Sequence, residues 1–241
     1  FDADAPQAPL PLARSVWARE ILRRAPTWPR TLGEVAEVTR GVNPYHHTTH
    51  TADQIAARVH HAAAPAGPDW VPEVRGRDLP EAFVLTERAD RWLQYGPWLK
   101  EPRDPRFFRG PRLLVRKIFG PTLCAVFLDR PLHCDQSVYI ARLRDGQPYD
   151  PFALLACVAS RVIAALLKAR HQEHDALFPQ LKVAELRAVP LPPVPPGDPH
   201  LARAAEAARA LQAGTADDRA ATRAALEAAI AAAYGVPPAH D

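Results

Sequence analysis

The chain of 241 residues contains no methionine and only three cysteines. Cys124, Cys134 and Cys157 are odd in number and lack the short spacing of metal ligands, which argues against a disulfide framework and a four-cysteine zinc site. We therefore expect a reducing, cytoplasmic setting. No apolar run approaches the roughly 20 residues of a membrane helix, and the acidic start at residues 1–4 is unlike a signal peptide, so we expect no membrane partner.

Several enzyme motifs are also missing. The sequence has no G-x-S-x-G elbow, no G-x-x-x-x-G-K phosphate loop and no G-x-G-x-x-G fingerprint after a predicted strand. We expect no catalytic residue, no bound metal and no cofactor in this chain. Because a start methionine is lacking as well, we expect a fragment of a longer protein.

Positive charge is present, and it is concentrated. The net charge of +3 neither requires nor excludes a polyanionic partner, but residues 103–117 hold six basic side chains and one acidic one. Arginines interleaved with aromatic residues suit nucleic acid, because guanidinium groups bind phosphates and guanine edges. A solvated face of an arginine-rich protein is the alternative. For a second cluster, Arg75-Gly76-Arg77-Asp78, we favour a structural ion pair at a turn.

Three weaker patterns have simpler interpretations. His46 and His50 would share a helix face and suit zinc, but no metalloprotease acid or nearby cysteine accompanies them, and we favour a polar surface loop. Asn43-Pro44-Tyr45 resembles the N-P-P-Y motif that holds a flipped adenine, with one proline missing. Glu73-x-Arg75 after Pro68-Asp69 resembles a metal-nuclease motif with arginine in place of lysine. We interpret both as coincidence.

Local patterns predict an α+β fold. Apolar spacing predicts helices at residues 12–22 and 151–170 and a helical hairpin over 199–234, with Thr215 as the N-cap of its second helix. Alternation and turn residues predict strands at 32–38, 71–75, 112–119, 122–128 and 136–143, the last three as an antiparallel meander. Prolines predict an extended segment over 186–196. We thus expect a mixed or antiparallel sheet with flanking helices, divided into a linker helix (1–30), a recognition domain (31–196) and a helical hairpin spacer (197–241).

Several segments occur in an order that resembles a known family. They are Leu32-Gly33-Glu34-Val35, Val74-Arg75-Gly76-Arg77-Asp78-Leu79, the basic run 105–118, His133-Cys134-Asp135-Gln136-Ser137-Val138-Tyr139-Ile140, the 151–170 helix, Phe178-Pro179-Gln180-Leu181-Lys182-Val183 and Val189-Pro190-Leu191-Pro192. Over about residues 31–195 the chain resembles the TaqI-like C-terminal specificity domain. This is the target recognition domain of adenine-N6 DNA methyltransferases and of type IIG restriction-modification enzymes.

The resemblance implies a domain that reads a short duplex sequence in the major groove. It also implies an N-terminal methyltransferase domain that binds S-adenosylmethionine, which this chain lacks. The helices after Pro196 look like spacers or docking surfaces of such enzymes. The alternatives are a docking domain of a multi-subunit restriction-modification complex and a self-contained metal nuclease.

The resemblance and the charge pattern together nominate the DNA-binding residues. Alternation over 112–118 places Arg112 and Arg116 on one side of a strand, and we expect that side to face the groove. We expect Lys182 to contact a phosphate. The full set is Arg40, Arg75, Arg77, Arg109, Arg112, Arg116, Lys117, Gln136 and Lys182.

Overall fold

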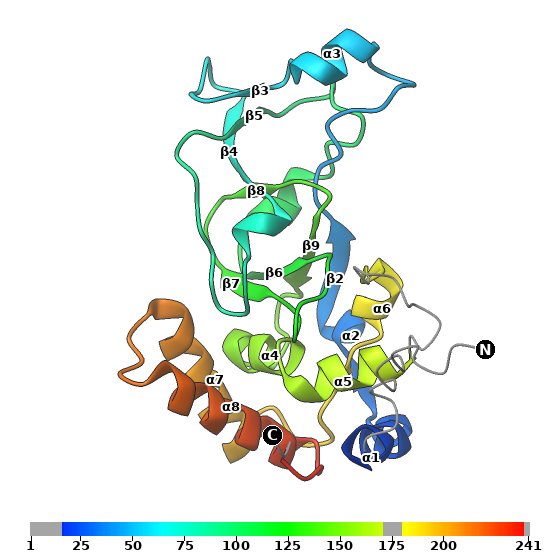
Figure 1. Cartoon of the computed structure of the whole chain (residues 1–241), viewed down its shortest axis with the longest axis vertical. Coiled ribbons are helices and arrows are strands. Elements are labelled where there is room, and N and C mark those ends of the chain that lie inside the picture. Colours follow the sequence, from blue (N-terminus) through cyan, green and yellow to red (C-terminus); the bar gives the residue numbers. More distant parts are fainter. Residues whose placement is uncertain (1–15, 171–179, 239–241) are drawn as a thin grey trace, which may run out of the picture.

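The computed structural model describes residues 16–170 and 180–238, and its elements form three layers (Figure 1). A four-stranded sheet lies in the middle, a second sheet with a short helix lies above it in the view, and helices lie below. The α+β class is confirmed. Residues 1–15 and 171–179, which include part of the predicted 12–22 helix as well as Phe178 and Pro179, lie outside the described residues.

The middle sheet is antiparallel throughout and has the order β2-β9-β6-β7. Its strands are β2 (Ala36–Arg40), β6 (Arg112–Arg116), β7 (Ala125–Leu128) and β9 (Val138–Leu143). The predicted meander is wrong in its order, because β9 pairs with β6 and not with β7. Between β7 and β9 the chain enters the second sheet as β8 (His133–Cys134), pairs in parallel with β4 (Trp70–Val74), and returns on the other side of β6.

The second sheet has the order β3-β5-β4-β8 and is built largely from residues 42–100. It joins β3 (His61–Ala62) to β5 (Trp92–Gln94) and β4, and the short helix α3 (Ala52–Ala57) precedes β3. The predicted strand at 71–75 is confirmed as β4. Two 3-10 turns, η3 (Gly76–Asp78) and η4 (Pro105–Phe108), follow β4 and β5 in the chain.

Both faces of the middle sheet are buried. On β6, Leu113 and Val115 pack into the core shared with the helices, whereas Leu114 packs into a second core shared with the upper sheet. Successive side chains of a strand point to opposite faces, so a strand covered on both sides is apolar at nearly every position. The sheet therefore has no open face for a ligand, and a binding surface must use its edges and turns.

The predicted helix over 151–170 is two helices, α4 (Pro151–Val158) and α5 (Arg161–Arg170), bent by 46°. Ser160 causes the break: its hydroxyl donates to the Cys157 carbonyl at 2.7 Å and accepts from the Ile163 N–H at 3.2 Å, so it caps α5. Within the described ranges, no single helix is long and apolar enough to cross a membrane; α4 and α5 reach that length and composition only as a bent pair.

The remaining helices flank these two, with the short sheet β1-β10 at the base. They are α1 (Val16–Arg24), the 3-10 turn η2 (Ala25–Thr27), α2 (Leu32–Val35), α6 (Val183–Arg187), α7 (Pro199–Ala213) and α8 (Arg219–Ala233), with β1 (Arg30–Thr31) paired to β10 (Pro190–Leu191). The predicted 199–234 hairpin is confirmed. Its apolar residues, including Leu201 and Ile230, lie in the same core as α4.

Three local predictions are wrong for identifiable reasons. The first half of the predicted 32–38 strand is the helical turn α2, because the Glu34 carboxylate accepts from the Thr31 N–H at 2.6 Å and closes that turn. The N-cap of α8 is Asp218 and not Thr215, since Asp218 accepts from the Ala221 N–H at 2.9 Å. The 186–196 segment is not wholly extended, because α6 continues to Arg187; β10, farther along, is extended as predicted.

Candidate nucleic-acid interface

Four separate segments meet where β2, β4 and β6 end. The Val42 N–H donates to the Cys134 carbonyl at 2.8 Å, and the Lys117 N–H donates to the Ser137 carbonyl at 2.9 Å. The Gly76 N–H donates to the Ser137 hydroxyl at 2.7 Å. The turn at 75–78 and the turn at 135–137 therefore lie against each other, with the end of β6 beside them.

Two glycines allow this close approach. A Cβ atom at Gly76 would lie 3.0 Å from the Ser137 carbonyl oxygen and 3.4 Å from Cγ of Arg116. At Gly41 a Cβ atom would overlap the carbonyl oxygens of Cys134 and Asp135. Close packing thus requires glycine at Gly41 and favours it at Gly76, and the backbone at Gly76 lies against the Arg116 side chain as a result.

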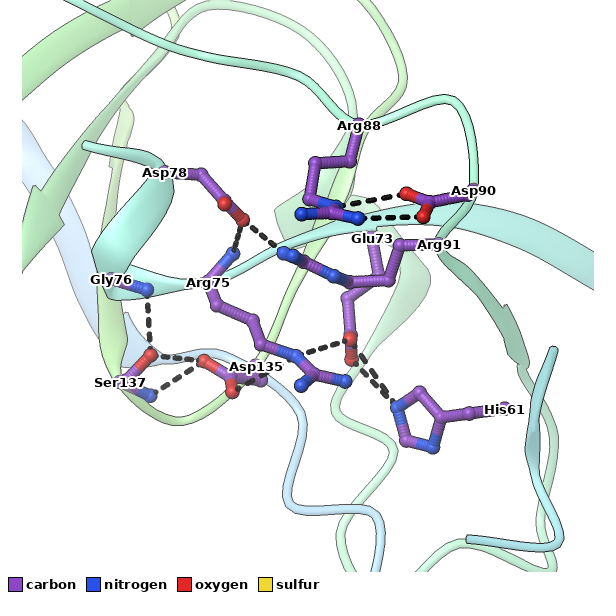
Figure 2. A network of polar contacts seen from close by, with 10 residues as sticks. All are labelled: His61, Glu73, Arg75, Gly76, Asp78, Arg88, Asp90, Arg91, Asp135 and Ser137. Carbon is purple, nitrogen blue, oxygen red and sulfur yellow. Dashed lines mark hydrogen bonds and ion pairs between the residues drawn. The ribbon is translucent and has the colours of Figure 1, made fainter. Parts of the chain in front are cut away.

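Arg75 is held in a buried ion-pair network (Figure 2). Its Nε donates to the Glu73 carboxylate at 3.1 Å and lies 3.8 Å from the carboxylate of Asp135, and its side chain is 19% exposed. The Glu73 side chain is fully buried and lies 3.3 Å from Nε2 of His61. The positive charge of Arg75 is therefore largely compensated within the protein.

The two carboxyl groups of this network respond differently to burial. Burial alone would raise the pKa of Glu73, but the hydrogen bond from His61 and the charges of His61 and Arg75 hold that pKa below its ordinary value. Burial and the nearby negative charge of Glu73 raise the pKa of Asp135, although the Ser137 hydroxyl and N–H and Arg75 oppose this. Glu73 is thus the permanent negative charge that anchors Arg75.

Asp78 fixes the backbone of the 75–78 turn. Its carboxylate accepts from the Arg75 N–H at 2.7 Å and forms a buried ion pair with Arg91. The structural interpretation of Arg75-Gly76-Arg77-Asp78 therefore holds for Arg75 and Asp78. Arg77 differs: its side chain is exposed and makes no hydrogen bond or ion pair with any other described residue.

Of the six basic side chains in the run at 103–117, two form ion pairs and a third is fully buried. Arg103 pairs with Glu101, and Arg106 pairs with Glu37 at 2.7 Å. Arg112 has no exposed surface, because its guanidinium donates to the carbonyls of Gly110, Arg130 and Leu132. The prediction that Arg112 faces the groove is wrong: alternation places Arg112 and Leu114 on the same side of β6, but the upper sheet covers that side.

The other nominated residues fall into two groups. Arg116 and Lys117 are half-buried beside the exposed Gln136, and the exposed Lys182 follows Leu181, whose N–H donates to the Lys117 carbonyl at 2.9 Å. Two further arginines lie apart from this group. Arg40 pairs with Glu101 at 2.7 Å, and Arg109 is exposed near His133, at the opposite end of β6.

Sequence reasoning missed three arginines on the residue 50–91 side of the 75–78 turn. Arg58, Arg88 and Arg91 line a recess of about 380 Å³ together with Arg75, Arg77 and His61. Three segments that are far apart in the chain build this recess. In the sequence, these three arginines are marked only by their residue type.

Residues 16–170 and 180–238 contain neither a cluster of metal-ligating side chains nor a disulfide. No three His, Cys, Asp or Glu side chains there are grouped so that they could hold a metal ion. The segment 47–50 is a turn before α3, so His46 and His50 do not share a helix face. All three cysteines are unpaired and buried.

Comparison with known proteins identifies the family. The sequence model of the TaqI-like C-terminal specificity domain matches residues 71–191. A search among curated proteins finds no match.

The chain also aligns with solved structures at low sequence identity. The type IIL enzyme MmeI in complex with DNA aligns with a TM-score of 0.48 and 11% identity over 88% of this chain and 34% of that one. A type I restriction-modification complex aligns with a TM-score of 0.43 and 16% identity, over 90% of this chain and 52% of that one. The HsdS subunit of Thermoanaerobacter tengcongensis aligns with a TM-score of 0.37 and 17% identity, over 94% of this chain and 47% of that one. The chain thus spans between a third and about half of their lengths. Since the family match covers half of its residues, this chain belongs to the TaqI-like C-terminal specificity domain family.

Proposed function

We propose that this chain is the sequence-specific duplex DNA recognition domain of a restriction-modification adenine-N6 methyltransferase, and that it acts without catalytic residues of its own. The observation that supports this most directly is the close packing of the two turns that carry Arg77 and Gln136, beside Arg116 at the end of β6. Arg77 and Arg116 form no ion pair with a described carboxylate, in contrast to Arg103 and Arg106.

These side chains match the chemistry of base recognition. An arginine donates two hydrogen bonds to O6 and N7 of guanine, and a glutamine pairs with N6 and N7 of adenine. Arg77 and Gln136 are exposed on adjacent turns, so we assign them to base edges. Lys117 and Lys182 carry compact charges close to this surface, and we assign them to phosphates.

Arg75 takes a positioning role in this proposal. Its charge is paired with that of Glu73, and this ion pair fixes the end of β4, where the 75–78 turn begins. S-adenosylmethionine and the methyl transfer belong to a separate domain of the parent protein in the cytoplasm. No reaction step is assigned to the residues of this chain.

Selection from a pool of random duplexes tests the proposal. The chain is bound at about 50 and about 200 mM salt, and retained duplexes are sequenced. We expect one enriched motif for the unmodified chain and for Arg19→Ala, which changes an exposed arginine on α1. Arg77→Ala should relax the preference at one base pair, at a cost of about 1–3 kcal/mol.

The other outcomes are equally informative. Salt-sensitive binding without a motif would reduce the function to non-specific DNA affinity. No binding at all would contradict the proposal and favour a docking role. Magnesium-dependent cleavage that is lost on chelation would identify a nuclease.

A further inference from the structure

The recess beside the 75–78 turn has the properties of an oxyanion site. It has a volume of about 380 Å³ and is formed by the end of α3, β3, the 75–78 turn and the segment 88–91. Figure 2 shows Arg75 and His61 directed at the buried Glu73, with Arg91 paired to Asp78 and Arg88 paired to Asp90 close by. Its charged lining consists of Arg58, Arg75, Arg77, Arg88, Asp90 and Arg91.

Three of these five arginines have a carboxylate partner. Arg75 pairs with Glu73, Arg91 pairs with Asp78, and Arg88 pairs with Asp90 at 2.6 Å. The side chains of Arg58 and Arg77 make no hydrogen bond or ion pair with another described residue. Two positive charges thus face one concave surface without compensation, and concave surfaces lined by one sign of charge concentrate counter-ions.

Arg91 provides a second observation that points to a ligand. It is 6% exposed and lines the recess, and its Nη2 is buried with no acceptor among the described residues. A buried guanidinium N–H without an acceptor is costly, and native proteins rarely leave one unpaired. A phosphate in the recess would place negative charge close to this incompletely paired guanidinium.

The backbone at Arg58 is in a conformation that residues other than glycine seldom adopt. Its φ is 51°, in the left-handed region, where it ends α3. The Arg58 N–H donates to the Ile55 carbonyl at 3.2 Å, and the His61 N–H donates to the Arg58 carbonyl at 2.8 Å. Glycine or asparagine is the usual residue at such a position, so an arginine here indicates a use for its side chain.

We propose that this recess binds one phosphate group, with Arg58 as its principal ligand and the other arginines of the lining providing positive charge around it. This inference rests on the proposed function for the source of the phosphate, which is the DNA backbone next to the bases contacted from the 75–78 turn. It also gives the residue 42–70 segment a role, because that segment contributes Arg58 and His61 to the lining. The site would fix the register of the domain on the duplex and carry no base preference.

Inorganic phosphate, followed through the arginine Nε–Hε signals in NMR, tests the site without DNA. We expect saturable shifts in the unmodified chain that weaken about tenfold or more in Arg58→Gly. Arg58→Gly relieves the left-handed backbone, so its thermal midpoint should stay the same or rise, which separates lost binding from lost folding. Arg19→Gln, on α1, is the matched control. Absence of saturation in the unmodified chain would overturn the site.

DNA binding then identifies the source of the phosphate. If the recess holds a backbone phosphate, Arg58→Gly should reduce the slope of log K against log salt by about 0.9 and leave the enriched motif unchanged. An altered motif with an unchanged slope would overturn the phosphate assignment. Phosphate binding by a chain that binds no duplex would refute the proposed function, while the recess would stand as a site for free phosphate compounds.

Discussion

At the scale of single residues, the arginines of this protein divide into those that hold the fold and those that face solvent. Arg112 is the clearest of the first kind, because its guanidinium ties Gly110 to Arg130 and Leu132 at 2.7 to 3.2 Å. Burial lowers the pKa of Arg112 to about 10, so the group stays charged at neutral pH. Its role is to close the turns at the start of β6.

Arg112→Met should therefore reduce stability and leave intrinsic DNA affinity unchanged. Three carbonyls lose their donor, and we expect the free energy of unfolding to fall by about 3 kcal/mol. Urea unfolding measures this change. Arg109→Met, at an exposed neighbour, is the control and should change stability by less than about 0.5 kcal/mol. A stable Arg112→Met chain with weakened DNA binding would contradict the structural role.

His133 should make stability depend on pH. Burial and the charge of Arg112 lower its pKa from 6.5 to about 4. Between these values the unfolded chain binds a proton that the folded chain does not, so stability falls as pH drops from 6.5 towards 4. The contribution is at most about 3 kcal/mol.

Replacement of the imidazole isolates this contribution. The ring of His133 is stacked on Phe108 with centroids 4.1 Å apart, and His133→Phe keeps an aromatic ring there. Urea midpoints measured from pH 7 to pH 4 should decline less steeply for His133→Phe than for the unmodified chain. Parallel declines would show that His133 does not titrate in this window.

At the scale of helices and strands, capping side chains set boundaries that hydrophobic spacing does not. Asp218→Ala should destabilise the protein by about 1 kcal/mol, because the Ala221 N–H at the start of α8 loses its acceptor. Thr215→Ala is the matched control, since the Thr215 side chain caps no helix in the structure. Thermal or urea unfolding compares the two. Equal losses would contradict the assignment of Asp218 as the cap.

The sequence was informative where an element depends on its own residues. The strand at β4, the antiparallel strand β6 and the hairpin of α7 and α8 were predictable from local periodicity. The helix break at Ser160 was not, because one hydroxyl decides it within an otherwise apolar pattern. The pairing of β9 with β6 was missed because it follows from the distant contact of β8 with β4.

The same distinction applies to the candidate interface. Residue type and order identified Arg77, Arg116 and Gln136, and the structure packs the turns that carry Arg77 and Gln136 against each other beside Arg116. Burial of Arg112 depends on carbonyls up to twenty residues away in the chain, and the recess depends on three segments. No local pattern carries that information.

At the scale of the whole molecule, the C-terminal hairpin shares its core with the rest. Leu201, Leu211, Leu226 and Ile230 are buried in one cluster with α4 and the lower face of the middle sheet. The boundary expected near Pro196 remains a prediction about domains. The shared core nevertheless indicates that the hairpin stabilises residues 31–196.

Truncation after Pro196 tests this coupling. Removal of α7 and α8 exposes the apolar surface of α4, and we expect the shortened chain to lose its cooperative urea transition and its near-ultraviolet circular dichroism. The full 241-residue chain is the reference. A shortened chain that unfolds cooperatively at the same midpoint would show that the hairpin is an independent spacer.

The covered faces of the middle sheet have an evolutionary consequence. Since β6 is buried on both sides, the residues assigned to DNA lie on turns and strand ends, where substitutions cost little folding energy. Gly41 is the exception, because close packing excludes any side chain there, and Gly76 leaves little room for one. Under the proposed function, a lineage of such proteins would acquire new target sequences through changes at Arg77 and Gln136 while the scaffold is inherited unchanged.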